Sequence, residues 1–477
     1  MNKYKTPKVC ALPSVAELRA SLLASEGSEV REQIAAIFDA GTFVETGAYM
    51  KRGFSEFLST EKSNELEGVI TGYGAVDGSL VFAFAQDAAR MGGAIDEHHA
   101  KKICDLYRLA MANGAPVIGI FASNGVDVFE GTAALAAYGK ILSAVNKARG
   151  VIPQIAYVAG NCIGTSAAVA ACFDVVVKEA GASLYVSSPT LTGEENAEKS
   201  LITYEDEKAN LAAYVRSLIS FLPDNSSVGV QVSDCVDNLN RMLGELDFGG
   251  EALSAISVIV DNGVFIELGK DHAKTVVTAL ATVGGVKCGI VANSFANNEG
   301  RLCPCCAKKI AKFINLCESF SIPVVTLVDS MGVKIDKSCN KGFASALASL
   351  ATAYASLTVP TVTVIMGHAV GASFVLLGSK ALGADLVYAT ENSLIGALSA
   401  ESGVAFAWDK YIIEEKTRDE LIAEWKADVA SPARAAESGE IDDIISVNEL
   451  RARICSALLM LASKNADYSK NRKVLPF

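Results

Sequence analysis

The sequence predicts an α/β protein made of two duplicated lobes, from an internal repeat and from short apolar runs that alternate with alanine-rich helices. FDAGTFVETG (38–47) in the first half matches VDNGVFIELG (260–269) in the second. Three landmark pairs share one spacing of 207 residues: Pro116 with Pro323, Pro153 with Pro360, and Gly164 with Gly371. A repeat at constant spacing indicates duplication. We expect a first lobe over residues 1–240 and a second over 241–477.

The predicted strands open with proline, which suits the first position of a buried strand. Each continues with β-favouring apolar residues. The four runs are PVIGIFA (116–122), PQIAYVA (153–159), PVVTLVD (323–329) and PTVTVIM (360–366).

Two helices are predicted between these strands, over 131–148 and 306–320, from helical spacing and strong helix formers. Strands that alternate with helices of this length indicate parallel sheets with right-handed crossovers.

Composition excludes several classes of protein. The chain has 477 residues, is 51% hydrophobic and carries a formal net charge of -12, with a pI near 5.0. No basic stretch is present to bind a nucleic acid backbone. No uninterrupted apolar run reaches the ~20 residues of a membrane span. The twelve cysteines and the polar start MNKYKTPKVC lead us to expect a reducing cytoplasm without disulfides.

Glycine turns follow the later strand of each lobe. GNCIGTSAAVAA (160–171) comes after the run 153–159, and GHAVGASFVLLG (367–378) comes after 360–366. The first amides of a helix have no intrahelical partner, so they can stabilise an oxygen that gains negative charge. We expect an oxyanion hole in each lobe, with donors from the following residues: Gly164, Thr165, Gly371, Ala372 and Ser373.

Several longer segments carry a resemblance to a known family: FAQDAARMGGAIDEHHAKKI (84–103), GVKCGIVAN (285–293) and SPARAAESGEIDDII (431–445). From these, the chain resembles the carboxyltransferase subunits of biotin-dependent acyl-CoA carboxylases and of sodium-pumping methylmalonyl-CoA or glutaconyl-CoA decarboxylases. The likeness extends from about residue 30 to 477.

The resemblance implies a crotonase-like ββα superhelical fold in each lobe. It also implies transfer of a carboxyl group between carboxybiotin and a short acyl-CoA of the propionyl or methylmalonyl type. The N-terminal lobe would hold the acyl-CoA, and the C-terminal lobe of a neighbouring subunit would hold biotin, in a dimer-based homo-oligomer, commonly a hexamer. A separate biotin carboxyl carrier protein is implied as a partner, with biotin carboxylase or membrane decarboxylase subunits as further candidates.

The same resemblance implies roles for individual residues. Gly164 and Thr165 would bind the thioester oxygen, while Gly371, Ala372 and Ser373 would bind the ureido oxygen of biotin. The substrate-binding positions that it implies are Gly92, Gly93, Ala94, Gly125, Val126, Cys162, Ile163, His368, Val370 and Val375.

The chain departs from the family in three places. Asp127, in SNGVDVFEG (123–131), stands where the family has an arginine. The stretch 190–230 lacks a histidine-threonine-serine-lysine-serine-glycine segment that follows the threonine-glycine-glutamate-glutamate of the family. Val375 occupies a position linked to the choice of acyl group.

Other residues favour structural roles. CPCC (303–306) has no second C-x-x-C, so no metal site is expected. His98 and His99 are expected in solvated or capping roles. The charged run 414–428 is expected to form an amphipathic helix with Trp425 on its buried side.

Two alternative functions stay open. A biotin-independent crotonase-type enzyme would use one oxyanion hole, and the duplication argues against it. A scaffold subunit that has lost catalysis would account for Asp127 and for the missing segment.

Overall fold

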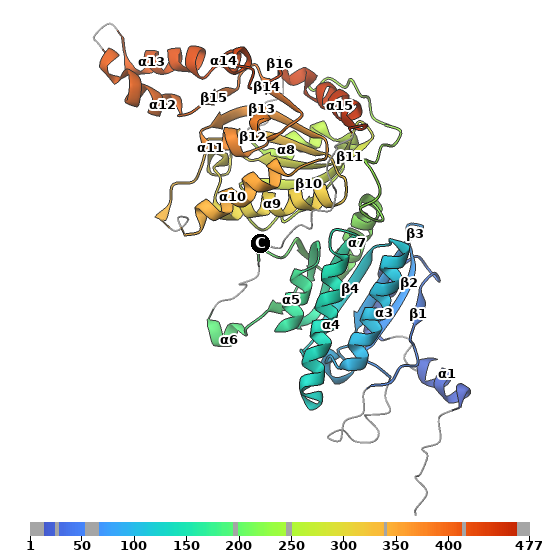
Figure 1. Ribbon diagram of the computed structural model, residues 1–477. Coiled ribbons are helices and arrows are strands. Elements are labelled where there is room, and N and C mark those ends of the chain that lie inside the picture. The colour runs from blue at the N-terminus through green and yellow to red at the C-terminus, as the bar shows by residue number, and fades with distance from the viewer. Residues whose placement is uncertain are drawn as a thin grey trace, which may run out of the picture.

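The computed structural model describes residues 14–23, 28–52, 66–193, 199–244, 250–337, 341–412 and 416–464. Within them the chain forms two eight-stranded sheets, each with helices on both faces (Figure 1). The prediction of an α/β protein with two duplicated lobes is confirmed.

The first sheet has the order β1-β2-β3-β4-β5-β6-β8, and β7 pairs with β5. Its strands are β1 (Val44–Thr46), β2 (Val69–Val76), β3 (Ser79–Gln86), β4 (Val117–Ser123), β5 (Gln154–Ile163), β6 (Val175–Glu179), β7 (Ser183–Tyr185) and β8 (Tyr204–Asp206). The pairings from β3 onward are parallel, as predicted. The pairings of β2 with β1 and β3 are antiparallel. Between β2 and β3, Asp77 and Gly78 form a tight turn with φ of 48° and 82°.

The second sheet repeats this order as β9-β10-β11-β12-β13-β14-β16, and β15 pairs with β13. Its strands are β9 (Phe265–Leu268), β10 (Val276–Val283), β11 (Val286–Asn293), β12 (Val324–Ser330), β13 (Thr361–Val370), β14 (Leu386–Thr390), β15 (Leu394–Gly396) and β16 (Asp443–Ile445). The strands β10 to β13 begin 207 residues after β2 to β5, so the spacing in the sequence is a spacing between equivalent strands.

The helices are also duplicated. In the first lobe, α3 (Glu97–Asn113) and α4 (Thr132–Ala148) cover one face of the sheet, and α2 (Glu29–Ile37) and α7 (Lys208–Phe221) cover the other. Their counterparts are α9 (Pro304–Ser319), α10 (Phe343–Ala355), α8 (Ala252–Ile259) and α15 (Leu450–Leu461). One hydrophobic core continues through both lobes and joins α7 side chains to those of α9.

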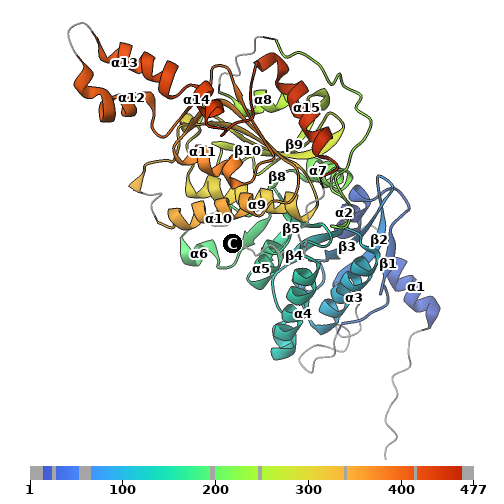
Figure 2. The same cartoon turned by 45° about the horizontal axis from the view of Figure 1, so that its top comes forward.

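A helical projection extends from the second lobe (Figures 1 and 2). It contains α12 (Ala400–Gly403), a π-helical turn over Val404–Trp408, α13 (Arg418–Glu424) and a second π-helical turn over Trp425–Val429. The predicted amphipathic helix corresponds to α13 and the turn after it. Trp425 is half-buried against Trp408, with ring centroids 4.9 Å apart, whereas Phe406 is 85% exposed.

The predicted boundary between the lobes falls in an extended connection. Val232 already pairs with Val286 of β11, so residues just before 240 accompany the second sheet. The boundary at 240 therefore stays a prediction. Among the described helices, none combines the length and apolar character that crossing a membrane requires.

Candidate functional site

The first glycine turn joins β5 to the short helix α5 (Thr165–Ala171). Gly164 has φ 62° and ψ -129°, the geometry of the first central residue of a type II′ turn, which favours glycine. A methyl group added to Gly164 would meet no atom within 4 Å, so this side of the turn is open to a ligand.

The structure distinguishes the two donors that we predicted at this turn. The Gly164 N–H donates to the Tyr185 carbonyl oxygen of β7 at 3.0 Å, so it is already used. The N–H of Thr165 donates to no acceptor in the part of the chain that the structure describes. Thr165 is also exposed, and it is the donor that remains available to a ligand.

The second turn has the same geometry. Gly371, between β13 and α11 (Ala372–Leu376), has φ 57° and ψ -126°, and its N–H donates to the Gly396 carbonyl oxygen at 2.8 Å. Ala372 therefore occupies the place of Thr165, and its N–H is likewise unused within the described ranges.

Ser373 is buried and has a structural hydroxyl group. Its Oγ donates to the carbonyl oxygens of Ser330 and Val370, and it accepts from the Val370 N–H at 3.1 Å. The side chain therefore fixes the turn and is not directed at a ligand.

Two loops lie beside the first turn and contain half of the predicted substrate-binding residues. The Asn124 N–H donates to the Gly92 carbonyl oxygen, and the Ile95 N–H donates to the Gly125 carbonyl oxygen, both at 2.9 Å. Val126 pairs with Ile95 in a parallel bridge. Ala94, next to Ile95, is half-buried in the first loop.

Gly93 makes this arrangement possible. A methyl group on Gly93 would lie 2.1 Å from the Ala122 carbonyl oxygen, and the equivalent Gly300 would meet the Asp329 carbonyl oxygen at 1.9 Å. Glycine is therefore required for both loops to lie against the strand ends.

Asn161, Cys162 and Ile163 form the last part of β5. The Asn161 side-chain amide donates to Asn124 Oδ1 at 2.7 Å and ties the strand to the neighbouring loop. Ile163 pairs with Tyr185. Cys162 is fully buried, and burial raises the pKa of its thiol to about 12, so its side chain contributes to packing and is inert as a nucleophile.

His368 stands beside the second turn. Its Nδ1 lies 2.9 Å from Asp329 Oδ1, and its ring stacks on Phe295 with centroids 4.5 Å apart. Asp329 also accepts from the His368 backbone N–H at 2.9 Å, which fixes the orientation of the imidazole. Val370 is buried, whereas Val375 on α11 is 49% exposed.

A cluster of buried charges lies between the loop of Gly125 and Val126 and the start of α3. Arg52 Nη2 donates to Asp127 Oδ2 at 2.5 Å, and His99 Nδ1 lies 3.3 Å from Glu67 Oε1. His99 is fully buried, so the expectation of a solvated or capping histidine is wrong for it, because its ring pairs with a carboxylate in the interior. His98 Nδ1 lies 2.8 Å from the Lys51 carbonyl oxygen.

Two carboxyl groups of this cluster have opposite pKa shifts. Burial alone would raise the pKa of Glu67, but the hydrogen bond and charge of His99 lower it to about 2. Burial, together with the charge of Glu67, raises the pKa of Asp96 to about 6.

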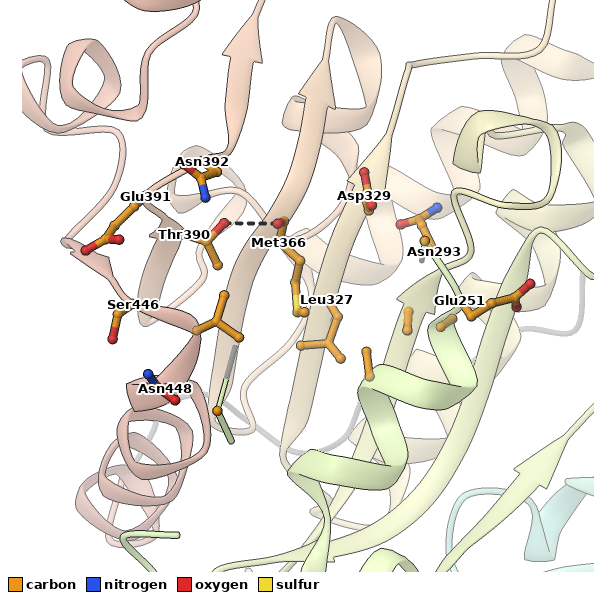
Figure 3. Close-up of a pocket in the computed structure, with 16 residues that line it drawn as sticks. Glu251, Asn293, Leu327, Asp329, Met366, Thr390, Glu391, Asn392, Ser446 and Asn448 are labelled. Atoms are coloured by element: carbon orange, nitrogen blue, oxygen red, sulfur yellow. Dashed lines mark hydrogen bonds between the residues drawn. The ribbon is translucent and has the colours of Figure 1, made fainter. Parts of the chain in front are cut away.

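A cavity lies elsewhere, in the second lobe between α8 and the residues that precede α15 (Figure 3). It has a volume of about 750 Å³, with Leu327 and Met366 at its floor. None of the predicted site residues lines it. Its walls carry the carboxylates of Glu251 and Asp329 together with asparagine, serine and threonine side chains.

The two turns of one chain do not face each other. In Figures 1 and 2, α9 and α10 lie between α5 and α11. A single chain thus presents two separate amide turns.

Several residues that shape the sites were not predicted from the sequence: Tyr185, Gly396, Asn124, Asn161, Asp329 and Phe295. Asp329 had a usable signal, because it closes a predicted parallel strand, where ligands bind in α/β sheets. No sequence signal identifies the carbonyl groups of Tyr185 and Gly396, because every residue has a backbone carbonyl group.

Comparison with known proteins gives one consistent result. Residues 24–475 match the family model for the carboxyl transferase domain. The α subunit of methylmalonyl-CoA decarboxylase from Propionigenium modestum is 34% identical, over 92% of this chain and 91% of that protein. The 12S subunit of methylmalonyl-CoA carboxyltransferase from Propionibacterium freudenreichii subsp. shermanii is 32% identical, over 92% and 90%.

The fold is shared with a solved structure. The crystal structure of transcarboxylase 12S, a hexamer with methylmalonyl-coenzyme A bound, matches with a TM-score of 0.87 and 29% identity. The match covers 96% of this chain and 98% of that one.

Proposed function

This chain belongs to the carboxyl transferase domain family, and from that membership we propose that it transfers a carboxyl group between carboxybiotin and a short acyl-CoA. Propionyl-CoA and methylmalonyl-CoA are the proposed pair, since the relatives include methylmalonyl-CoA decarboxylase and propionyl-CoA carboxylase subunits. The observation that supports this most directly is the pair of equivalent glycine turns, each with an unused amide.

The first turn suits a thioester. When proton loss from the α-carbon moves negative charge onto the thioester oxygen, the Thr165 N–H can donate to it. The missing side chain of Gly164 leaves room for the acyl group. The hydrogen bond from Asn161 to Asn124 keeps the loop of Gly125 and Val126 beside the first turn.

The second turn suits a planar urea. Bound carboxybiotin supplies the carboxyl group, and Ala372 N–H would donate to its ureido oxygen. Ser373 fixes this turn, His368 forms one wall and Asp329 fixes the orientation of His368. Because no nucleophilic side chain is required, the inert Cys162 is consistent with this scheme.

The separation of the turns supports an oligomer. Since one chain does not bring them together, we propose that the first turn of one subunit faces the second turn of another. A dimer-based homo-oligomer, as in the transcarboxylase 12S hexamer, would meet this requirement. The exposed Phe406 on the helical projection supplies apolar surface for such a contact.

The partners follow from the reaction. A separate biotin carboxyl carrier protein would deliver the biotin, and biotin carboxylase or membrane decarboxylase subunits would complete the pathway. The cysteines in the described ranges are free thiols, which supports a cytoplasmic location.

The buried partner of Asp127 argues for the enzyme and against the scaffold alternative. A charge reversal without a partner would leave the first site disrupted, whereas Arg52 neutralises Asp127 within the protein. The departure from the family is thus compensated.

The test is carboxyl exchange between methylmalonyl-CoA and free biotin by the purified chain, followed as formation of propionyl-CoA. Gly164→Ala places a methyl group on the open side of the turn, where it would keep the thioester oxygen away from the Thr165 N–H. It should lower kcat by roughly 10²–10³-fold, as loss of one oxyanion hydrogen bond does. Gly131→Ala is the matched control, because Gly131 has nearly the same backbone angles, φ 59° and ψ -124°, and open space around it. A wild-type chain that exchanges no carboxyl group with any acyl-CoA tested would favour the scaffold.

A further inference from the structure

Three cysteines begin α9 in the run CPCC (303–306), and the proposed reaction uses none of them. The Sγ atoms of Cys303 and Cys306 lie 2.9 Å apart. Cys303 is the N-cap residue, half-buried, and its sulfur accepts from the Cys306 N–H at 3.2 Å. Cys306 is fully buried, and Cys305 between them is exposed. The pair therefore combines one reachable thiol with one protected thiol.

The duplication provides an internal comparison for this pair. At the equivalent place in the first lobe, 207 residues earlier, Asp96 caps α3 and accepts from the His99 N–H at 2.7 Å. Cys303 occupies the position of this carboxyl group, and Cys306 occupies that of His99. The start of a helix favours an anion through its free amides and its dipole. A thiolate at Cys303 thus takes the place of a carboxylate.

The surroundings separate the acidities of the two thiols. The hydrogen bond from the Cys306 thiol, together with backbone amides and the charge of Lys334, lowers the pKa of Cys303 to about 6. The same hydrogen bond, together with burial, raises the pKa of Cys306. At neutral pH, Cys303 is therefore the nucleophilic thiolate and Cys306 keeps its proton. Nucleophilic attack on sulfur needs a thiolate that a disulfide can reach.

A metal site is a weaker explanation of the motif. Within the ranges that the structure describes, no group of three or more histidine, cysteine, aspartate or glutamate residues is placed to hold a metal ion. Zinc sites of this kind need four ligands, and the pair supplies two.

We propose that Cys303 and Cys306 form a reversible dithiol–disulfide site that reacts with small disulfides such as oxidised glutathione. The Cys303 thiolate attacks one sulfur of the disulfide, breaks its S–S bond and releases a thiolate, which takes up a proton. The Cys306 thiol then loses its proton and attacks the Cys303 sulfur, which breaks the mixed disulfide and releases the second thiol. Two electrons pass from the two cysteines to the disulfide, and excess reduced glutathione reverses both steps.

The site is close to the second amide turn. Leu302, next to Cys303, donates its N–H to the Gly332 carbonyl oxygen and accepts from the Lys334 N–H. Gly332 in turn lies against Val370, since a methyl group on it would be 3.2 Å from the Val370 carbonyl oxygen. Oxidation removes the thiolate that caps α9. A shift at Cys303 could reach Gly371 through two contacts, that of Leu302 with Gly332 and that of Gly332 with Val370.

The experiment uses the full chain in buffers with a graded ratio of oxidised to reduced glutathione, quenched with an alkylating reagent and analysed by mass spectrometry of peptide 302–308. That peptide contains all three cysteines of the motif, so variants decide which two react. In the wild type, the oxidised peptide should lose two hydrogens and two alkylation sites. Cys303→Ser and Cys306→Ser should abolish this change, and Cys306→Ser should retain glutathione on Cys303. Cys305→Ser is the matched control and should behave as the wild type.

Folding of the variants is checked by their unfolding temperature. Serine is a good N-cap residue, so Cys303→Ser should unfold close to the reduced wild type. The proposal fails if Cys303→Ser still forms the disulfide, if Cys305→Ser prevents it, or if the pair stays reduced until the chain is unfolded.

Discussion

Arg52 and Asp127 form a buried ion pair next to the loop of Gly125 and Val126, with Arg52 Nη2 2.5 Å from Asp127 Oδ2 and both side chains at most 2% exposed. Arg52 also lies 3.8 Å from Asp96, the cap of α3. One cation therefore connects the loop of Gly125 and Val126 to the start of α3. This explains how the chain accommodates an acidic residue where its resemblance to the family predicts an arginine.

Asp127→Ala should destabilise the protein by about 3–5 kcal/mol, because it leaves the Arg52 charge buried without its main partner. Denaturant unfolding measures this difference. Asp105→Ala is the control, since Asp105 pairs with Lys101 at the surface, where removal of an ion pair costs about 1 kcal/mol or less. Equal losses in the two variants would show that the Arg52 charge is neutralised by other means.

Gly93→Ala should disrupt the first site more than any other small change near it. The added methyl group would overlap the Ala122 carbonyl oxygen, so the loop must move away from β4. Forced packing of this kind costs about 1–3 kcal/mol or more, and we expect a raised KM for the acyl-CoA as well. Gly139→Ala, in open space on α4, should leave the KM nearly unchanged and raise the free energy of unfolding by up to about 1 kcal/mol, because alanine favours a helix interior more than glycine. A Gly93→Ala chain with wild-type stability and KM would contradict the close packing.

His368→Asn tests the second site separately. The first lobe has Asn161 at the position of His368, so asparagine fits this backbone. If His368 contacts biotin, the variant should raise the KM for free biotin roughly tenfold or more, as loss of a hydrogen bond to a charged partner would, and leave the KM for the acyl-CoA unchanged. A change confined to the KM for the acyl-CoA would move His368 out of the biotin site.

The sequence alone was sufficient for the parts of the structure that depend on local patterns. Proline-initiated apolar runs located β4, β5, β12 and β13, and the spacing of 207 residues identified their equivalence. The strands extend further than the runs suggest, because Asn161 to Ile163 and His368 to Val370 gain partners in β7 and β15. These pairings are made by backbone hydrogen bonds, so the pattern of apolar side chains does not predict them.

Contacts between residues far apart in the sequence could not be predicted from the sequence alone. Arg52 and Asp127 are 75 positions apart, and Asp329 and His368 are 39 apart. The site residues stay a prediction, but the structure narrows the choice of donors. The amides of Gly164 and Gly371 donate to backbone carbonyl oxygens, whereas those of Thr165 and Ala372 donate to none in the described part of the chain.

The Cys303 thiol should show a pH dependence that an ordinary cysteine lacks. With its pKa at about 6, alkylation of Cys303 in the native chain should reach half of its maximal rate near pH 6, instead of near the usual value of about 8.5. The folded state then binds fewer protons than the unfolded state between these values, so the free energy of unfolding should rise with pH across that interval and lose this contribution as the pH falls through 6. Cys303→Ser should remove this part of the slope. A midpoint near pH 8.5 for alkylation of Cys303 in the Cys305→Ser background would mean that the helix cap does not hold a thiolate.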